Sequence, residues 1–227
     1  MPPGNSILAG LPGTEFNHLK PHLQRVSWHG GQVLVDVATH LDCFYFPESG
    51  MVCRFAVMDD GRTVALAAVG REGFLGVPAF LGAESTQLRA VVLIAGDGLK
   101  LGQDELRRIL PVSPHFAASL RRYGSSYLAQ ITAIGACHAL NSVQQRAAFW
   151  LLMAHDRNGS HSLPLTHESL SELLGCRRAS VTDSLSLLEH AGVIHCGRGH
   201  ISILDHSRLA EQTCECYASL IKRAASG

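Results

Sequence analysis

The segment from Leu163 to Leu204 constrains the fold more tightly than any other part of the chain. Thr166 can cap a short helix, because a threonine hydroxyl accepts a backbone N–H at a helix N-terminus. Gly175 then interrupts the helical spacing of the leucines, and that spacing resumes over residues 177–190. The pattern predicts two short helices joined by a glycine-bearing turn.

The second of these helices has two different faces. Its predicted buried side repeats at helical spacing and consists of Val181, Leu185 and Leu188. Its outward side is small and polar and consists of Ala179, Thr182, Asp183 and Ser186, with Arg178 at the edge. A helix this slim fits a DNA major groove about 12 Å wide, where its N-terminal residues approach base edges. The segment is therefore typical of a helix-turn-helix.

Residues 193–204 predict a β-hairpin directly after the second helix. Two short apolar stretches flank the turn Gly197-Arg198-Gly199, and Arg198 at the tip suits a phosphate contact. A hairpin in this place is the wing of a winged helix-turn-helix. The same residues also fit an ordinary helical hairpin followed by a surface turn, which would leave a protein rather than DNA as the partner.

The N-terminal part has a different pattern, with short strands punctuated by glycine turns. The clearest hairpin signal is Asp59-Asp60-Gly61-Arg62, since Asp-Gly tolerates the positive φ of a tight turn. The predicted strands cover residues 33–35, 43–46, 51–58, 63–69, 90–95 and 98–101. Many short strands favour a sandwich or barrel. The predicted fold class is α+β, with an N-terminal antiparallel, jelly-roll-like β-roll.

A long helix is predicted over residues 114–138. Its apolar residues recur at helical spacing: Phe116, Leu120, Tyr123, Tyr127, Leu128, Ile131 and Ile134. A stripe of this length can pack on a partner helix, although it can equally pack on its own domain. Asn141, with Gln144 three residues later, predicts a capping box at the start of the next helix. The expected domains are residues 1–110, 111–140 and 141–227.

Composition adds four expectations. The formal net charge of zero weighs against a nucleic-acid binder, so the interpretation rests on the local motif. No apolar run approaches the ~20 residues of a membrane span, and the N-terminus lacks the features of a signal peptide, which predicts a cytoplasmic protein without a membrane partner. The seven cysteines fit reduced thiols. No enzyme motif such as HExxH or a P-loop is found, so no catalytic residue is assigned.

With this order of parts, the chain resembles the Crp/Fnr superfamily of bacterial regulators over nearly its whole length. The segments that carry the resemblance are residues 173–181, LLGCRRASV, and residues 70–76, GREGFLG. The resemblance implies a cyclic-nucleotide-binding-type β-roll, a dimerisation helix and a winged helix-turn-helix. It also implies a homodimer, double-stranded DNA with a palindromic operator, and RNA polymerase as partners. The implied dimer interface consists of Leu120, Tyr123, Tyr127, Leu128, Ile131 and Ile134.

The resemblance assigns roles within the second helix. Arg178 matches the guanine-reading arginine of the family, and Arg177 and Ser180 match residues near the phosphates. Ala179 and Asp183 stand where the cyclic-AMP receptor has a glutamate and a second arginine, so a different half-site is expected. The full set of expected DNA contacts is Thr166, Arg177, Arg178, Ala179, Ser180, Thr182, Asp183 and Arg198.

The expected effector pocket departs from cyclic-AMP binders. Its candidate residues are Gly76, Val77 and Arg89, and the carboxylate that would hold a ribose is missing. A buried phosphate needs paired, charge-assisted hydrogen bonds, so cyclic AMP is not expected to be the effector. The Gly70-x-x-Gly73-x-x-Gly76 pattern is interpreted as turns, because Pro78 argues against a helix directly after it.

The effector stays unknown, and the sequence requires no cofactor. Cys43 and Cys53 flank one predicted hairpin and offer a redox pair as an alternative to inert thiols. Cys214 and Cys216 lie two apart on a predicted helix with no partner cluster in view, so no metal ligand is assigned. The alternative function is a small-molecule, haem or redox sensor whose helical domain engages a protein.

Overall fold

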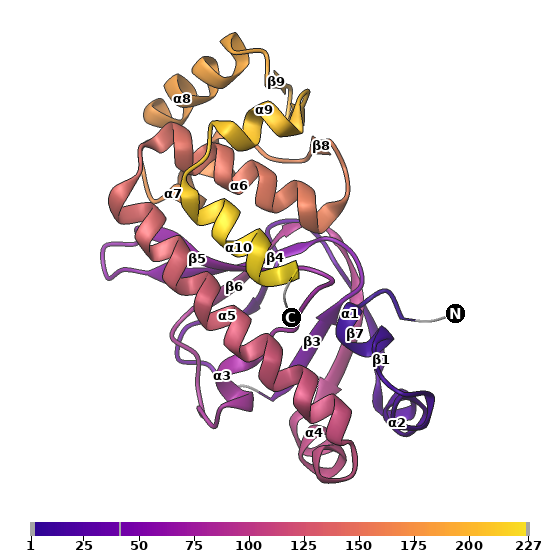
Figure 1. Ribbon diagram of the computed structural model, residues 1–227. Helices are drawn as coiled ribbons and strands as arrows, with labels where there is room; N and C mark the ends of the chain where they lie inside the picture. The colour runs from indigo at the N-terminus through magenta and orange to yellow at the C-terminus, as the bar shows by residue number, and fades with distance from the viewer. Residues whose placement is uncertain (1–2, 41, 226–227) are drawn as a thin grey trace. The chain divides into compact units, whose positions relative to one another are not determined.

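The computed structural model describes residues 3–40 and 42–225 and confirms the α+β class (Figure 1). The chain divides into two compact units, the first formed by residues 1–53 and 69–127 and the second by residues 54–68 and 128–227. Antiparallel sheets occupy the N-terminal part, a long helix follows, and a helix-turn-helix lies toward the C-terminus. In the described ranges, no helix has both the length and the apolar character needed to cross a membrane.

Two sheets make up the β-roll. One has the strand order β1-β7-β3 and the other the order β2-β6-β4-β5. The strands are β1 (Gln24–Trp28), β2 (Val33–Val35), β3 (Cys43–Pro47), β4 (Met51–Val57), β5 (Thr63–Val69), β6 (Arg89–Ile94) and β7 (Gly96–Gly102). Strands β4 and β5 continue into the second unit as the predicted hairpin, whose turn is closed by a hydrogen bond from Met58 N to Arg62 O of 2.9 Å.

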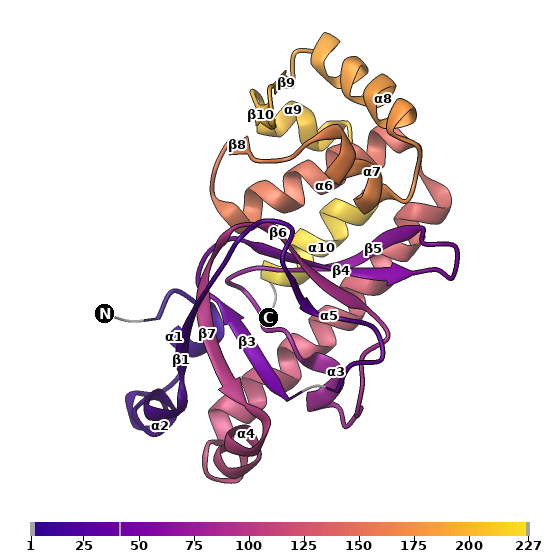
Figure 2. The same ribbon diagram turned by 180° about the vertical axis from the view of Figure 1, so that it is seen from behind.

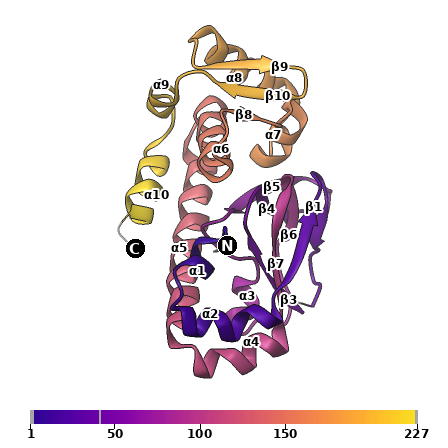
Figure 3. The ribbon, with the colours of Figure 1, turned by 90° about the vertical axis from the view of Figure 1, so that its right-hand side faces the viewer.

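Aromatic side chains fill the core of the first unit. Phe46 stacks on Phe74 with ring centroids 5.8 Å apart, and Phe116 packs on Phe46 at 6.0 Å. These three rings are fully buried. The first unit also contains short helices that the sequence patterns did not predict, four of which are labelled in Figure 3: α1 (Ser6–Ala9), α2 (Gly13–Leu19), η1 (Lys20–His22), α3 (Val77–Phe80), α4 (Gln103–Ile109) and η2 (Leu110–Val112).

Helix α3 corrects one expectation from the sequence. Pro78 was expected to prevent a helix after Gly76, yet α3 begins at Val77. A proline is tolerated in the first turn of a helix, because the N–H it lacks would have no partner inside the helix. The helix is only four residues long, which fits a turn rather than a phosphate-binding helix.

The long helix α5 (Pro114–Leu140) begins where predicted and is capped by a distant acid. Glu15 accepts the backbone N–H groups of His115 at 3.2 Å and Phe116 at 3.0 Å. Burial of Glu15 would raise its pKa, but the hydrogen bonds from His115 and Phe116 outweigh it and lower that pKa below the ordinary value. The carboxylate thus complements the positive end of the helix dipole.

Helix α6 (Val143–Asn158) begins one residue later than predicted. The capping box is formed by Ser142 and Gln145, not by Asn141 and Gln144. The predicted and observed N-cap residues differ by one position. In the observed helix, the apolar run from Ala147 to Ala154 is buried.

The second unit continues as a winged helix-turn-helix (Figure 2). Its remaining elements are β8 (Ser162–Leu163), α7 (His167–Leu174), α8 (Arg178–His190), β9 (Ile194–Gly197), β10 (His200–Ile203), α9 (His206–Glu211) and α10 (Glu215–Ala225). The strands form an antiparallel sheet of order β8-β10-β9. Trp150 of α6 lies at the centre of this unit and is 1% exposed.

The residues expected at a dimer interface divide into two groups. Leu120, Tyr123, Tyr127 and Ile134 are buried by the chain itself. Tyr123, for example, packs on Phe74, with ring centroids 5.3 Å apart. The side chain of Leu128 is 55% exposed, and Ile131 is half-buried. Most of the apolar stripe therefore serves the fold of this chain, and only its outer members are available to a partner.

Candidate nucleic-acid interface

Helix α7 is capped at both ends. Thr166 caps α7 through a capping box, in which Ser169 N donates to Thr166 Oγ1 at 3.1 Å and Thr166 N donates to Ser169 Oγ at 2.8 Å. Gly175 ends the helix in the left-handed region with φ of 59°. A Cβ at Gly175 would lie 3.0 Å from Val64 and 3.1 Å from the carbonyl of Thr63. Only glycine meets both demands without displacing the β4–β5 hairpin.

Helix α8 has the predicted two faces. Val181, Leu185 and Leu188 are fully buried. The expected contact residues Arg177, Arg178, Ala179 and Asp183 are exposed, whereas Ser180 and Thr182 are half-buried. The helix therefore presents a narrow polar surface, as entry into a major groove requires. Leu187, which is 57% exposed near the C-terminal end, was not expected there.

The N-terminus of α8 carries the positive charge of this surface. Arg177 is the N-cap residue, and no side chain in the described parts of the chain caps the helix. Its first backbone N–H groups are thus available to an anion, as at other phosphate-binding helix ends. Arg178 lies 3.9 Å from Glu168 of α7, measured from Nη1 to Oε2, and both side chains are mostly exposed.

Thr182, one of the expected contact residues, forms hydrogen bonds within the fold. Its hydroxyl lies 2.9 Å from Nδ1 of His167 and donates to the carbonyl of Arg178 at 3.1 Å. The threonine therefore links α8 to the first turn of α7. This contact holds the two helices in register rather than leaving the hydroxyl free for a base.

The wing is attached to the end of α8 by one carboxylate. Oε1 of Glu189 accepts the backbone N–H of Cys196 at 2.8 Å and lies 3.0 Å from Nδ1 of His195. The Cys196 hydrogen bond, helped by His195, lowers the pKa of Glu189 below its ordinary value. Arg198 at the wing tip is exposed, as predicted. No sequence pattern singled out Glu189, because its partners are brought to it by the hairpin.

A polar connection within the second unit runs from strand β5 to the helix-turn-helix. His138 lies with Nε2 2.9 Å from the carbonyl of Ala65 and Nδ1 3.3 Å from Arg146 Nη1. Arg146 also donates to the carbonyl of Leu174, the last residue of α7, at 3.1 Å. Burial lowers the pKa of His138, which favours the neutral ring. With Nε2 as donor and Nδ1 as acceptor, a neutral ring satisfies both neighbours.

The expected effector residues lie in the first unit but do not form an open phosphate site. Arg89 is paired with Asp36, with Nε 2.8 Å from Oδ1 and Nη2 3.3 Å from Oδ2. The Arg89 hydrogen bond lowers the pKa of Asp36. Val77 is buried, and a Cβ at Gly76 would collide with the ring of Phe44. Asp36, which the sequence did not single out, thus occupies the bidentate face of the arginine.

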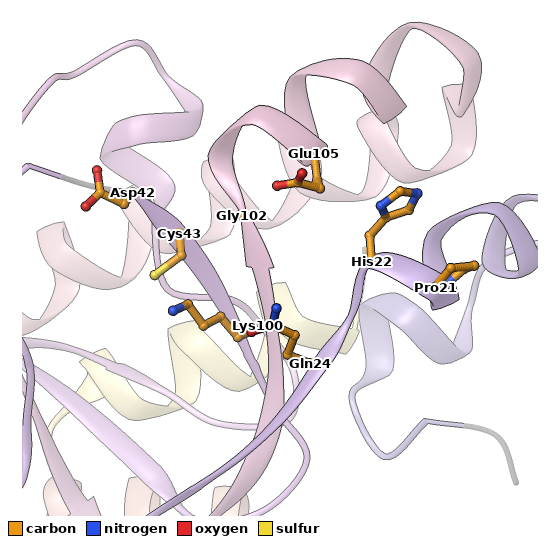
Figure 4. Close-up of a pocket in the computed structure, with 8 residues that line it drawn as sticks. All are labelled: Pro21, His22, Gln24, Asp42, Cys43, Lys100, Gly102 and Glu105. Atoms are coloured by element: carbon orange, nitrogen blue, oxygen red, sulfur yellow. The ribbon is translucent and has the colours of Figure 1, made fainter.

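A pocket of about 380 Å³ lies elsewhere in the first unit (Figure 4). It is lined by η1, by strands β1, β3 and β7, and by α4. The side chains that give it chemical character are Lys100, Cys43, Asp42, His22 and Glu105. It offers both charges and a thiol to a small polar ligand. The strands that carry Cys43 and Lys100 were predicted, but their convergence with η1, β1 and α4 was not.

Among the described residues, two groups of side chains have the composition of metal sites. His155, Asp156 and His206 form one, and Cys137, Cys214 and Cys216 form the other. In each group the potential ligand atoms lie within 4.8 Å of one another. The sequence showed no partner for Cys214 and Cys216, because Cys137 is distant in the chain and comes from α5. Cys43 and Cys53, which the sequence offered as an alternative redox pair, lie on strands of two different sheets.

The comparisons with known proteins agree with this architecture. The model of the cyclic nucleotide-binding domain matches residues 25–111, and the model of the Crp-like helix-turn-helix domain matches residues 145–212. Transcriptional regulator SdrP of Thermus thermophilus is 28% identical over 198 residues, which cover 83% of this chain and 93% of that protein.

Solved structures with the same fold are also found. TTHA1359, a Crp/Fnr-family regulator from Thermus thermophilus, is 26% identical with a TM-score of 0.68, covering 83% of this chain and 97% of its own. FixK2 from Bradyrhizobium japonicum has a TM-score of 0.72 at 17% identity, covering 85% and 98%. The matched relatives are regulators of transcription, not enzymes, in line with the absence of catalytic motifs from the sequence.

Proposed function

Because the chain belongs to the Crp/Fnr superfamily of transcriptional regulators, we propose that it binds a two-fold symmetric DNA operator as a homodimer. Each protomer inserts α8 into a major groove. The observation that carries this proposal is the exposed, slim N-terminal half of α8, supported from behind by fully buried Val181, Leu185 and Leu188. A homodimer with two such helices matches a palindrome, since half-sites mirror the symmetry of the protein.

The contacts divide into base reading and backbone positioning. Arg178 reads guanine through a bidentate contact, and Asp183 accepts from the amino group of cytosine. Ala179 between them leaves room for the thymine methyl or for close approach of the helix. Arg177, Ser180, Thr166 and Arg198 hold phosphates, which fixes the register of the helix without reading sequence. Thr182 contacts His167 of α7 and so holds α8 in position against α7.

The proposed dimer contact is the outer face of α5. Leu128, which is 55% exposed, and half-buried Ile131 are the apolar members left uncovered by the chain's own fold. Several exposed positions around them are small, namely Ser125, Thr132, Ala136 and Ala139. Small residues let two helices approach closely, and a leucine at the centre supplies the buried apolar area.

The first unit is proposed to receive a signal other than cyclic AMP. Asp36 competes with any phosphate for Arg89, and a bound phosphodiester would have to displace this pair without a ribose-binding carboxylate to compensate. The pocket of about 380 Å³ around Lys100 is the alternative receptor site. The link from Ala65 through His138 and Arg146 to Leu174 gives strand β5 a route to bias the α7–α8 turn.

RNA polymerase is proposed as the second partner and the cytoplasm as the place of action, because a regulator of transcription meets both DNA and polymerase there. Whether the regulator activates or represses depends on where its operator lies relative to the polymerase.

The proposal is tested by selecting bound sequences from a random pool of duplexes with the full-length protein. A palindromic consensus with half-sites about one helical turn apart is expected. Binding to it should weaken steeply as salt rises, because phosphate contacts release counterions. A protein indifferent to every duplex would support the alternative, a sensor whose helical unit engages a protein.

A further inference from the structure

Three cysteines of the second unit converge on one point. Cys137 lies in the last turns of α5, Cys214 immediately precedes α10, and Cys216 lies in the first turn of α10. The Sγ atoms of Cys137 and Cys214 are 3.2 Å apart, and all three sulfurs lie within 4.8 Å of one another. Cys137 is 2% exposed and Cys214 6%, while Cys216 is half-buried and gives access from solvent.

We propose that Cys137, Cys214 and Cys216 bind a single thiophilic cation, Zn²⁺ or Cu⁺, through three thiolates. A thiolate sulfur lies about 2.3 Å from zinc, so sulfurs around one ion are about 4 Å from one another. The observed triangle is close to that size, and small side-chain rotations complete it. All three donors are sulfur, which selects soft cations over Mg²⁺ or Ca²⁺.

The environment of the sulfurs fits ion binding better than a plain apolar core. Cys214 lies at the N-terminal end of α10, where the helix dipole favours negative charge. A thiol that binds the ion as a thiolate gives up its proton to solvent, so ion binding should strengthen as the pH rises.

A disulfide between Cys137 and Cys214 is the competing use of the same atoms. That bond would use only two of the sulfurs, and it would not account for the third sulfur, of Cys216, that lies beside them. The third sulfur is the observation that favours an ion. A bound ion would tie the start of α10 to the end of α5, so ion binding should also raise the unfolding temperature.

The experiment uses the full-length, reduced protein titrated separately with Zn²⁺ and with Cu⁺ against a chromophoric chelator. One ion per chain is expected for at least one of the two cations. Cys216→Ser, which changes the most accessible of the three sulfurs and is the variant least disruptive to folding, is expected to weaken binding at least tenfold. Cys196→Ser removes a half-buried thiol of the wing, outside the cluster, and should bind as the unaltered protein does.

Circular dichroism and thermal unfolding show that each variant is folded, and ion-induced stabilisation should be lost in Cys216→Ser but kept in Cys196→Ser. The proposal is overturned if the reduced protein retains neither cation. Equal binding by folded Cys216→Ser and unaltered protein would also overturn it. So would a reduced protein that binds no ion but forms the Cys137–Cys214 disulfide with a mild oxidant, as judged by mass.

Discussion

Arg178 at the start of α8 lies 3.9 Å from Glu168 of α7, and both side chains are mostly exposed. An ion pair of this kind is weak, because water screens it and two long side chains must be held in place. Glu168 can therefore hold the guanidinium near its proposed reading position and still release it to a guanine. The same carboxylate carries negative charge to the surface that is proposed to meet phosphates.

Replacing Glu168 with Gln is expected to strengthen DNA binding. The substitution frees Arg178 and removes one repulsive charge, and a surface pair of about 0.2–1 kcal/mol corresponds to at most about a fivefold gain in affinity. Fluorescence anisotropy with the selected operator measures the gain. Weaker binding by Glu168→Gln would mean instead that the carboxylate is needed to orient the arginine.

Replacing Arg178 with Ala is expected to remove the preference for guanine at one symmetric position of the operator. A bidentate arginine discriminates against other bases by about 1–3 kcal/mol. Arg107→Ala is a matched control, because that side chain is 68% exposed against 69% for Arg178 and lies in α4 of the first unit. Repeating the selection with both variants checks the assignment. An unchanged consensus from Arg178→Ala would exclude its reading role.

Replacing Asp183 with Ala should relax the choice of cytosine at a neighbouring position while leaving overall affinity the same or higher. In its proposed role the carboxylate accepts from the cytosine amino group but repels phosphates, so its loss should affect specificity more than affinity. Ser186→Ala serves as the control, since the Ser186 hydroxyl already donates to the carbonyl of Thr182 at 2.9 Å. A uniform loss of affinity for all sequences would contradict this role for Asp183.

The attachment of the wing to α8 should weaken in acid. Hydrogen bonds from Cys196 and His195 hold the pKa of Glu189 below its ordinary value of 4.5. Its stabilising contribution is therefore complete above pH 4.5 and is lost as the pH falls through the lowered value of the folded state. Glu189→Gln should unfold at a lower temperature than the unaltered protein at pH 7, and the difference should shrink toward pH 3.

Glu211→Gln controls for the loss of a carboxylate, because Glu211 lies exposed at the end of α9. Thermal unfolding followed by circular dichroism from pH 7 to pH 3 is the measurement. If the difference between Glu189→Gln and the unaltered protein stays constant across this range, the carboxylate does not stabilise the wing through its charge.

The helix-turn-helix could be predicted from sequence because its signals are local. The spacing of Val181, Leu185 and Leu188 and the glycine at position 175 specify the two helices and the turn without reference to the rest of the chain. The same holds for the Asp60-Gly61 hairpin. The N-cap was predicted one residue too early, at Asn141 instead of Ser142, because both of these adjacent polar residues can cap a helix.

Contacts between distant segments could not be predicted in this way. Asp36 meets Arg89 only because β2 pairs with β6, and Cys137 meets Cys214 only because α10 returns to the end of α5. The apolar stripe of α5 shows a related limit. The helical spacing predicts that Tyr123 packs against an apolar surface, but only the three-dimensional structure shows that this surface includes Phe74 of the same chain.

The close approach of the β4–β5 hairpin to Gly175 gives the last prediction. Gly175 and Gly159 both end helices in the left-handed region, with φ of 59° and 68°, but only Gly175 has neighbours within 4 Å of a Cβ built on it. Alanine at either position costs about 1–2 kcal/mol of backbone strain. Gly175→Ala must also displace Val64, so it should lower the unfolding temperature further than Gly159→Ala does.

The same displacement should act on DNA binding. Because Leu174 is joined through Arg146 and His138 to Ala65 of the hairpin, moving the hairpin disturbs the turn that carries α8. Gly175→Ala should weaken operator binding at temperatures where it is still folded, while Gly159→Ala should bind as the unaltered protein does. Thermal unfolding and anisotropy together separate the two effects. Equal behaviour of the two variants in both measurements would show that the hairpin contact neither stabilises the turn nor transmits a signal to it.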